Sequence, residues 1–347
     1  MMLPRVSNVD SAERLRLGGL FGVVALMHLV GWGVLFLVAP DNPTLLGTGV
    51  LAYSLGLRHA FDADHIAAID NTTRAALQDG RRHVGVGFFF SLGHSTVVAA
   101  MALALAVATD TARTALPSLE TVGGFIGALV SGSFLYAIGL LNLLVLVDLF
   151  RVFLRMRDGE YDPEGLEAKL RKRGFVSRFA GRYFDAVRRS WHVYPLGVLF
   201  GLGFDTASEV ALLAIAAGAA SDGLSPTAIA VLPLLFAAGM SLLDTADGAF
   251  MLYAYDWAFS TPLRKIYYNL TVTGVSVAVA LFVGTVELLQ VFASGLDLRG
   301  GLWTAAQSID TGNVGYAIVA LFVFAWLASY LFWRIGNIEE RWSAESS

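Results

Sequence analysis

Eight apolar stretches constrain the fold of this chain more than any other feature. They lie at 18–39, 45–69, 84–109, 122–147, 194–219, 227–252, 267–293 and 313–334. A transmembrane helix needs about 20 predominantly apolar residues, and a helix satisfies its own backbone polar groups inside lipid. The sequence therefore predicts an all-α, polytopic membrane protein with about eight transmembrane helices in two four-helix halves.

The charged residues lie mostly between these stretches and indicate the orientation of the chain. Basic residues gather at the N-terminus, in the connections near 70–83 and 253–266, and in the segment 151–192, whereas 40–43, 110–121, 220–226 and 294–312 hold only Arg113 and Arg299. Because basic connections stay in the cytoplasm, we expect a multi-pass protein of the inner (cytoplasmic) membrane with both termini cytoplasmic. The segment 151–192 is predicted to be a basic cytoplasmic loop between spans 1–4 (1–150) and spans 5–8 (193–347).

Composition narrows the chemistry. The chain is 56% hydrophobic, with a mean hydropathy of +0.63 and no cysteine. A disulfide, a thiolate nucleophile and an iron–sulfur cluster are thereby excluded, so any metal must be held by nitrogen and oxygen. The first 16 residues lack the small-residue cleavage site of a secretory signal, and Met1 is expected to belong to the mature chain. We expect the lipid bilayer as a partner and no nucleic acid.

Four ionisable residues crowd the second stretch. The sequence LRHAFDADHIAAIDN places His59, Asp62, Asp64 and His65 within seven positions. A charged residue in mid-membrane costs roughly 2.5–3.5 kcal/mol, so the group requires compensation, and a bound cation supplies it. Two imidazoles with carboxylates and no sulfur suit Ni²⁺, Co²⁺ or Zn²⁺ better than Mg²⁺ or Ca²⁺.

The geometry of this cluster leaves two arrangements open. In a regular helix, with about 100° per residue, His59, Asp62 and His65 share one face and Asp64 points the other way. Asp64 would then contact another helix or a ligand histidine. Alternatively the helix is distorted between Arg58 and His65, and freed backbone groups help to coordinate the cation. We favour the distortion over both the regular helix and a hydrated helix end.

Other polar residues inside the stretches are sparse and fall in four of them. The predicted metal-site residues outside span 2 are His28, His94, Asp205, Glu209, Asp244 and Asp247. His28 lies in the span that precedes the cluster and could face it. The carboxylates of spans 5 and 6 would form an acidic path that strips water from a cation, although hydrogen bonds between helices in a static bundle are the alternative.

The two halves of the chain resemble each other. GLRHAFDADHIAAI in span 2 is similar to GLGFDTASEVALLAI in span 5, and FSLGHS in span 3 is similar to GMSLLDT in span 6. Spans 2 and 5 are expected to cross in opposite directions, as are spans 3 and 6. This is the pattern of an inverted repeat, in which the binding site lies between the halves near the midplane.

These motifs together resemble the NiCoT family of nickel/cobalt transporters. RHAFDADHI contains the His-x4-Asp-His signature at His59, Asp64 and His65, and FSLGHS, GFDTASEV and GMSLLDTADG resemble the further signatures in spans 3, 5 and 6. The resemblance runs from span 1 to span 8. It implies high-affinity uptake of Ni²⁺ or Co²⁺, with the signature histidines and aspartates as essential residues.

The leading hypothesis is a secondary transporter, not an enzyme, that moves Ni²⁺ and/or Co²⁺ as its substrate and uses no cofactor. The chain has no G-x-x-x-x-G-K-[ST] loop for a nucleotide. One alternative is a membrane metal-binding subunit of a larger transport complex. Another is an intramembrane metalloenzyme, which the absence of an H-E-x-x-H motif disfavours. Proton exchange and a homo-oligomeric assembly both stay open.

Overall fold

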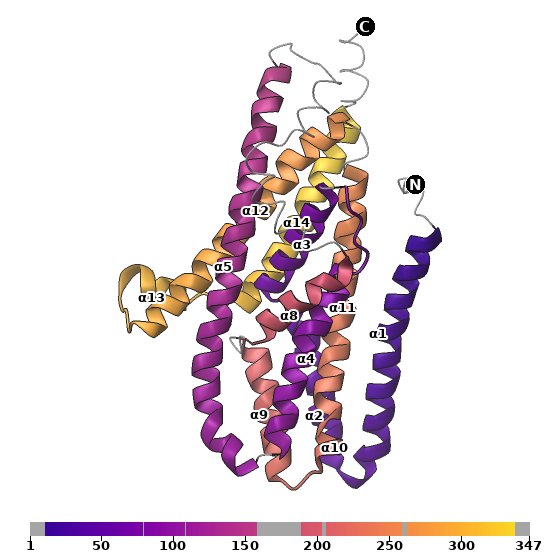
Figure 1. Ribbon diagram of the computed structural model, residues 1–347, viewed down its shortest axis with the longest axis vertical. Coiled ribbons are helices and arrows are strands. Elements are labelled where there is room, and N and C mark those ends of the chain that lie inside the picture. The colour runs from indigo at the N-terminus through magenta and orange to yellow at the C-terminus, as the bar shows by residue number, and fades with distance from the viewer. Residues whose placement is uncertain are drawn as a thin grey trace.

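The structure is a bundle of helices that share one long axis (Figure 1). The computed structural model describes residues 11–78, 80–107, 109–157, 189–202, 206–258 and 262–336. Within these ranges every regular element is helical and no strand occurs. The predicted all-α class is confirmed.

Five of the predicted spans correspond to long helices whose bounds differ from the prediction by a few residues. They are α1 (Ser11–Val38), α4 (Val86–Val107), α11 (Val231–Ala258), α12 (Pro262–Gly295) and α14 (Thr311–Gly336). The short elements η1 (Ala39–Asp41) and α10 (Pro226–Ile229) adjoin α1 and α11, whereas η2 (Ser190–Val193) and α13 (Gly301–Gln307) lie in the connections. By length and apolar composition, four helices of the described ranges can cross a membrane: Ser11–Asp41, Val86–Val107, Pro226–Tyr255 and Leu270–Gly295.

Span 2 is interrupted in its middle. The helix α2 (Pro43–His59) ends at the first signature histidine, and α3 (Ala63–Gln78) begins four residues later. In the turn between them the N–H of Phe61 donates to the carbonyl of Arg58 at 3.0 Å, and the N–H of Asp62 donates to that of His59 at 2.9 Å. The carbonyl of Asp62 accepts from Ile66, so an aspartate holds the position before the new helix, where that residue type is favoured. The distortion predicted between Arg58 and His65 is confirmed.

Span 5 is also divided, which the sequence did not predict. The helix α8 (Tyr194–Gly201) stops well short of the expected length, and α9 (Ala207–Ser221) resumes the span. The Phe-Asp pair shared with span 2 falls in this gap, although residues 203–205 lie outside the described ranges. Both interruptions therefore occur in the two segments that resemble each other.

The fourth span is longer than predicted. A single helix of 49 residues, α5 (Thr109–Arg157), replaces the expected span 122–147. The predicted outer connection 110–121 and the first residues of the predicted loop 151–192 are helical. The cytoplasmic placement of that loop stays a prediction. Hydropathy marks only the part that lipid can hold, whereas Ala, Leu, Glu and Arg continue a helix beyond it. Of the predicted loop, residues 158–188 lie outside the described ranges.

Glycines allow several helices to meet backbone to backbone. A side-chain carbon on Gly56 of α2 would overlap the carbonyl of Phe236 on α11, and one on Gly93 of α4 would overlap that of Tyr194 on α8. Span 2 thus packs on span 6, and span 3 packs on span 5. These contacts join the two halves of the chain and surround the middle of the bundle.

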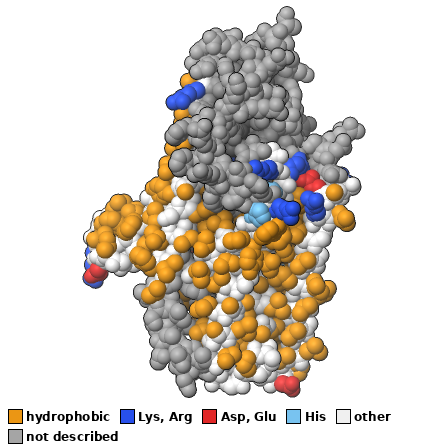
Figure 2. Space-filling view, viewed as in Figure 1, with side chains coloured by type: hydrophobic (Ala, Val, Ile, Leu, Met, Phe, Trp, Pro, Cys, Tyr) orange, Lys and Arg blue, Asp and Glu red, His pale blue; other side chains and the backbone are white. Residues whose placement is uncertain are grey.

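The surface fits a membrane environment. Figure 2 shows hydrophobic side chains over most of the lower part of the molecule, with charged side chains gathered in a band above them. Large exposed apolar residues lie on α1 and α14, including Leu29, Leu37 and Phe324. Helix α1 begins and α14 ends at the same end of the bundle (Figure 1). The protein is a multi-pass membrane protein.

Candidate metal centre

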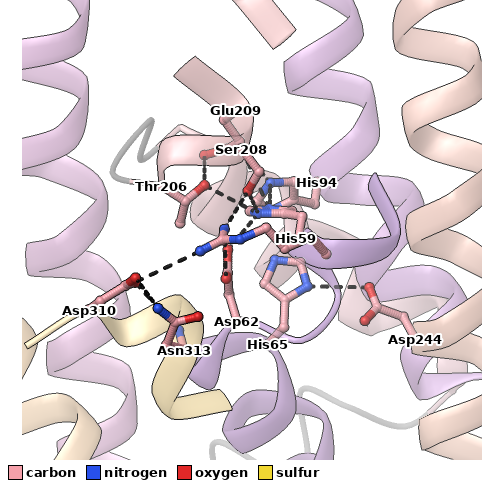
Figure 3. Close-up of polar contacts among 11 residues, drawn as sticks. His59, Asp62, His65, His94, Thr206, Ser208, Glu209, Asp244, Asp310 and Asn313 are labelled. Carbon is pink, nitrogen blue, oxygen red and sulfur yellow. Dashed lines mark hydrogen bonds and ion pairs between the residues drawn. The ribbon is translucent and has the colours of Figure 1, made fainter. Parts of the chain in front are cut away.

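Three buried histidines converge in the middle of the bundle (Figure 3). His59 ends α2, His65 lies in the first turns of α3, and His94 lies on α4, and one ring nitrogen of each falls within 4.8 Å of the others. Each residue is at most 2% exposed. Six residues of continuous helix would separate His59 from His65 by about 9 Å along the axis. The turn at 60–62 brings their ring centroids to 4.5 Å instead.

A carboxylate fixes the ring of His59. The Oδ2 atom of Asp62 lies 2.8 Å from Nδ1, and the hydroxyls of Thr206 and Ser208 lie 3.2 Å from the same nitrogen. Because an ionised carboxylate only accepts hydrogen bonds, Nδ1 carries the proton and donates it to Asp62. The lone pair of Nε2 then points into the cluster, 2.9 Å from Nε2 of His94.

His65 is held in the same way from another helix. Its Nδ1 lies 3.3 Å from Oδ2 of Asp244 on α11. Its Nε2 is buried and has no hydrogen-bond partner among the described residues. An imidazole whose other nitrogen is bonded to a carboxylate is the usual arrangement of a histidine that ligates a metal. His59 and His65 each present Nε2 in this manner.

Glu209 adds an oxygen to the three nitrogens. Its Oε1 lies 2.6 Å from Nε2 of His94 and 3.9 Å from Nε2 of His59, and its Oε2 accepts from Thr206 at 3.3 Å. Ligands that share one ion at about 2.0–2.2 Å lie about 3–3.5 Å from each other. The donors of His59, His94 and Glu209 lie 2.6–3.9 Å from one another, so small side-chain shifts would place one oxygen and up to three nitrogens around a single small divalent cation.

Aromatic rings enclose the cluster. The ring of Phe90 packs edge-on against His65 with centroids 4.8 Å apart, and that of Phe236 lies 5.5 Å from His59. These rings exclude water from the donors, which strengthens electrostatic interactions inside the site. Buried imidazoles and carboxylates lack hydrogen bonds to water, and a bound cation would stabilise them instead.

The other predicted site residues take different positions. Asp64 is buried in the first turn of α3. Asp247 lies one turn beyond Asp244 on α11, and its Oδ2 is buried with no partner among the described residues. Asp205 lies outside the described ranges.

His28 is not brought into the cluster. Its Nδ1 lies 2.8 Å from the carbonyl of Val24, and its Nε2 lies 3.2 Å from the hydroxyl of Tyr53. Both ring nitrogens are thus occupied next to α2, on the outside of the site. The structure adds residues that the predicted site did not include, namely Arg58, Thr206 and Ser208. Their only signal in the sequence is a position beside the predicted ligands.

The fold and the site define a polytopic helical membrane protein with a buried, sulfur-free cluster of histidines that could hold a metal ion. The chain belongs to the high-affinity nickel-transport protein family, whose model matches residues 45–332. It is 53% identical to the nickel transporter NixA of Staphylococcus aureus over 95% of this chain and 98% of that one. It is 52% identical to the nickel transporter NicT of Mycobacterium tuberculosis over 96% and 93% of the two chains.

A third relative is named for another metal. The chain is 44% identical to the cobalt transport protein NhlF of Rhodococcus rhodochrous over 92% of this chain and 93% of that one. No solved structure matches the chain. The predicted resemblance to nickel/cobalt transporters is confirmed, and the family and these relatives are named as transporters rather than enzymes.

Proposed function

We propose that the protein is a secondary transporter that carries Ni²⁺ and/or Co²⁺ across the cytoplasmic membrane into the cell. The observation that carries this proposal is the buried set of His59, His65, His94 and Glu209 at the interruptions of spans 2 and 5. A site at the junction of half-helices between two halves is typical of secondary transporters.

The mechanism follows from the state of the donor atoms. Nε2 of His65 faces the cluster and is buried without a hydrogen-bond partner among the described residues. Leaving such a polar atom unpaired costs about 1–3 kcal/mol. A cation that loses its water one molecule at a time recovers this energy by binding that nitrogen. Carbonyls released by the turn at 60–62 can take part in the exchange of ligands, as in other discontinuous helices.

The direction of movement rests on electrostatics. The membrane potential, negative inside, favours entry of a divalent cation by about 2.3 kcal/mol per charge per 100 mV. The chain has no nucleotide-binding loop of the G-x-x-x-x-G-K-[ST] type to supply energy from ATP. The basic connections support cytoplasmic termini. The start of α1 and the end of α14 lie at the same end of the bundle, which agrees with that orientation (Figure 1).

The donor set suits nickel and cobalt alike. Both ions accept imidazole nitrogen and carboxylate oxygen and differ by small geometric terms. Relatives named for each metal support a substrate range that includes both. The proposed substrates are therefore first-row divalent cations, specifically Ni²⁺ and/or Co²⁺.

Uptake into liposomes tests the proposal. The purified protein is reconstituted, an inside-negative potential is imposed, and entry of radiolabelled Ni²⁺ and Co²⁺ is measured without ATP. We expect saturable uptake of at least one ion, mutual competition between the two, and no competition from a large excess of Mg²⁺. Vesicles with the His59→Ala variant serve as the control. Binding without uptake would instead favour a metal-binding subunit of a larger complex.

A further inference from the structure

Arg58 lies between the histidine cluster and the exposed surface. Its Nη1 is 3.5 Å from Oδ1 of Asp62 and 3.3 Å from the hydroxyl of Ser208, and its Nη2 is 3.8 Å from Oδ1 of Asp310. The side chain of Arg58 is 28% exposed, that of Asp62 is 2% exposed, and that of Asp310 is 56% exposed. The guanidinium therefore lies between the buried site and the solvent.

Asp310 is firmly placed at this boundary. It immediately precedes α14, its carbonyl accepts from Val314 at 3.1 Å, and its Oδ2 accepts from the side chain of Asn313 at 2.6 Å. Gly315, one turn into α14, packs against the backbone of Phe61 in the turn of span 2. Figure 3 shows Asp310 and Asn313 on the side of the cluster opposite to Asp244. The start of α14 thus covers the turn that holds His59.

Asp62 is shared between the histidine and the arginine. Its Oδ2 accepts from His59, and its Oδ1 faces Arg58. A guanidinium is positively charged at every physiological pH, so Arg58 repels a metal cation that approaches His59. Its contacts at 3.5 and 3.8 Å are longer than the 2.7–2.9 Å of strong charge-assisted bonds. Arg58 can therefore leave Asp62 readily and move closer to Asp310, whose carboxylate lies 3.8 Å away.

We propose that Arg58 and Asp310 form the outer gate of the cation site. With the cluster empty, Arg58 neutralises Asp62 and blocks access from the connection 296–310. A divalent cation bound to His59 replaces Arg58 as the positive charge near Asp62. Arg58 then moves toward Asp310 and opens the path from the connection 296–310 to the cluster. This proposal rests on the proposed function, because it assigns the outer side to the connection between α12 and α14.

A chain without cysteine allows a direct test, because any introduced thiol is unique. Ser208→Cys places the thiol beside both His59 and Arg58. Its modification by a charged, membrane-impermeant methanethiosulfonate is measured in right-side-out and inside-out vesicles, with and without Arg58→Gln. We expect Arg58→Gln to raise the labelling rate at least tenfold from the outer side, and Asp310→Asn to raise it less. Asp297→Asn is the matched control, since Asp297 is exposed on the same connection beside Arg299, and it should leave the rate unchanged.

Two results would overturn the gate. One is an unchanged rate in Arg58→Gln, both with Ser208→Cys and with Thr206→Cys as a second reporter. The other is an increase seen only from the inner side. Equilibrium binding of Ni²⁺ to the purified variant adds a readout that a merely structural role would not produce. Loss of the repulsion should tighten binding several-fold, whereas a damaged site would bind more weakly. Labelling requires no transport, so failure of the proposed function would leave this test intact.

Discussion

The three histidines of the cluster differ in what holds their second nitrogen. Asp62 holds that of His59, and Asp244 holds that of His65, whereas Nδ1 of His94 has no partner among the described residues. A carboxylate behind an imidazole fixes its tautomer and raises its basicity. In the proposed site His59 and His65 are therefore oriented before a cation binds, and His94 is positioned by Glu209 through the nitrogen that faces the cluster.

Removal of either oriented histidine should abolish uptake. His59→Ala and His65→Ala each delete a nitrogen that no neighbouring oxygen can replace, so we expect Ni²⁺ entry to fall to that of empty vesicles. His192→Ala, on η2 beside Trp191, is the matched control and should transport normally. Uptake per amount of protein in the membrane is the measurement. Near-normal entry in either cluster variant would remove the histidine cluster from the mechanism.

Asp62 should behave as a residue that orients a ligand. Loss of such a partner typically weakens metal affinity 10–100-fold. We expect Asp62→Asn, which can still accept from Nδ1 of His59, to lie near the low end of that range and Asp62→Ala near the high end. Equilibrium binding of Ni²⁺ to purified variants measures both. An Asn variant as defective as His59→Ala would mean that Asp62 itself contacts the ion.

The amino-acid sequence indicates the members of this site better than their roles. Ionisable residues are conspicuous inside apolar spans, so hydropathy alone points to His59, His65, His94 and Glu209. A regular helix would place Asp62 on the ligand face together with His59 and His65. The turn at 60–62 instead directs Asp62 to Nδ1 of His59. Such a choice depends on shifts of a few ångströms in the backbone, which residue types alone do not determine.

Among the helices, the sequence predicted one of the two breaks and underestimated the length of α5. The break in span 2 was predictable, because a site that binds and releases an ion gains from it, and the structure confirms it. The break between α8 and α9 was not predicted, since the length of span 5 fits a single membrane-spanning helix. The length of α5 was underestimated, because helix propensity extends past the apolar residues.

Helix packing beside the site should be sensitive to one methyl group. Gly56→Ala would press a carbon into the backbone of Phe236 and force α2 away from α11, and overpacking of this kind costs about 1–3 kcal/mol. We expect a lower midpoint of thermal unfolding in detergent and reduced Ni²⁺ uptake. Gly33→Ala on α1, where nothing lies within 4 Å of the added carbon, is the control and should be neutral or slightly stabilising. Equal midpoints for the two variants would contradict this packing.

Within the described residues, two features of the molecule agree with the predicted inverted repeat. Spans 2 and 5 are both interrupted, and the contacts of span 2 with span 6 and of span 3 with span 5 are the pair that a two-fold axis would exchange. The hydroxyls of Ser91 and Ser241, which correspond in the two halves, lie 3.0 Å apart. The repeat itself stays a prediction, as does the division of the chain at 151–192. The residues 158–188 of that loop lie outside the described ranges.

Transport by such a molecule should depend on voltage. If two charges cross with each Ni²⁺ ion, 100 mV contributes about 4.6 kcal/mol, which is more than a thousandfold in accumulation at equilibrium. We expect an inside-negative potassium diffusion potential, set with valinomycin, to accelerate Ni²⁺ entry and an inside-positive one to slow it. Entry that ignores the potential and acidifies the outside would instead indicate exchange of one divalent cation for two protons.

The absence of sulfur from the cluster bears on the protein's tolerance of other metals. Imidazole and carboxylate donors bind divalent ions in the order Co²⁺ < Ni²⁺ < Cu²⁺, so copper should occupy this site more tightly than the cargo does. A carrier turns over only when the ion leaves, and an ion held too strongly stalls it. Cu²⁺ is therefore expected to act as a slowly reversible poison of nickel entry. A cell that relies on this protein for nickel would then grow short of nickel when copper outside it rises.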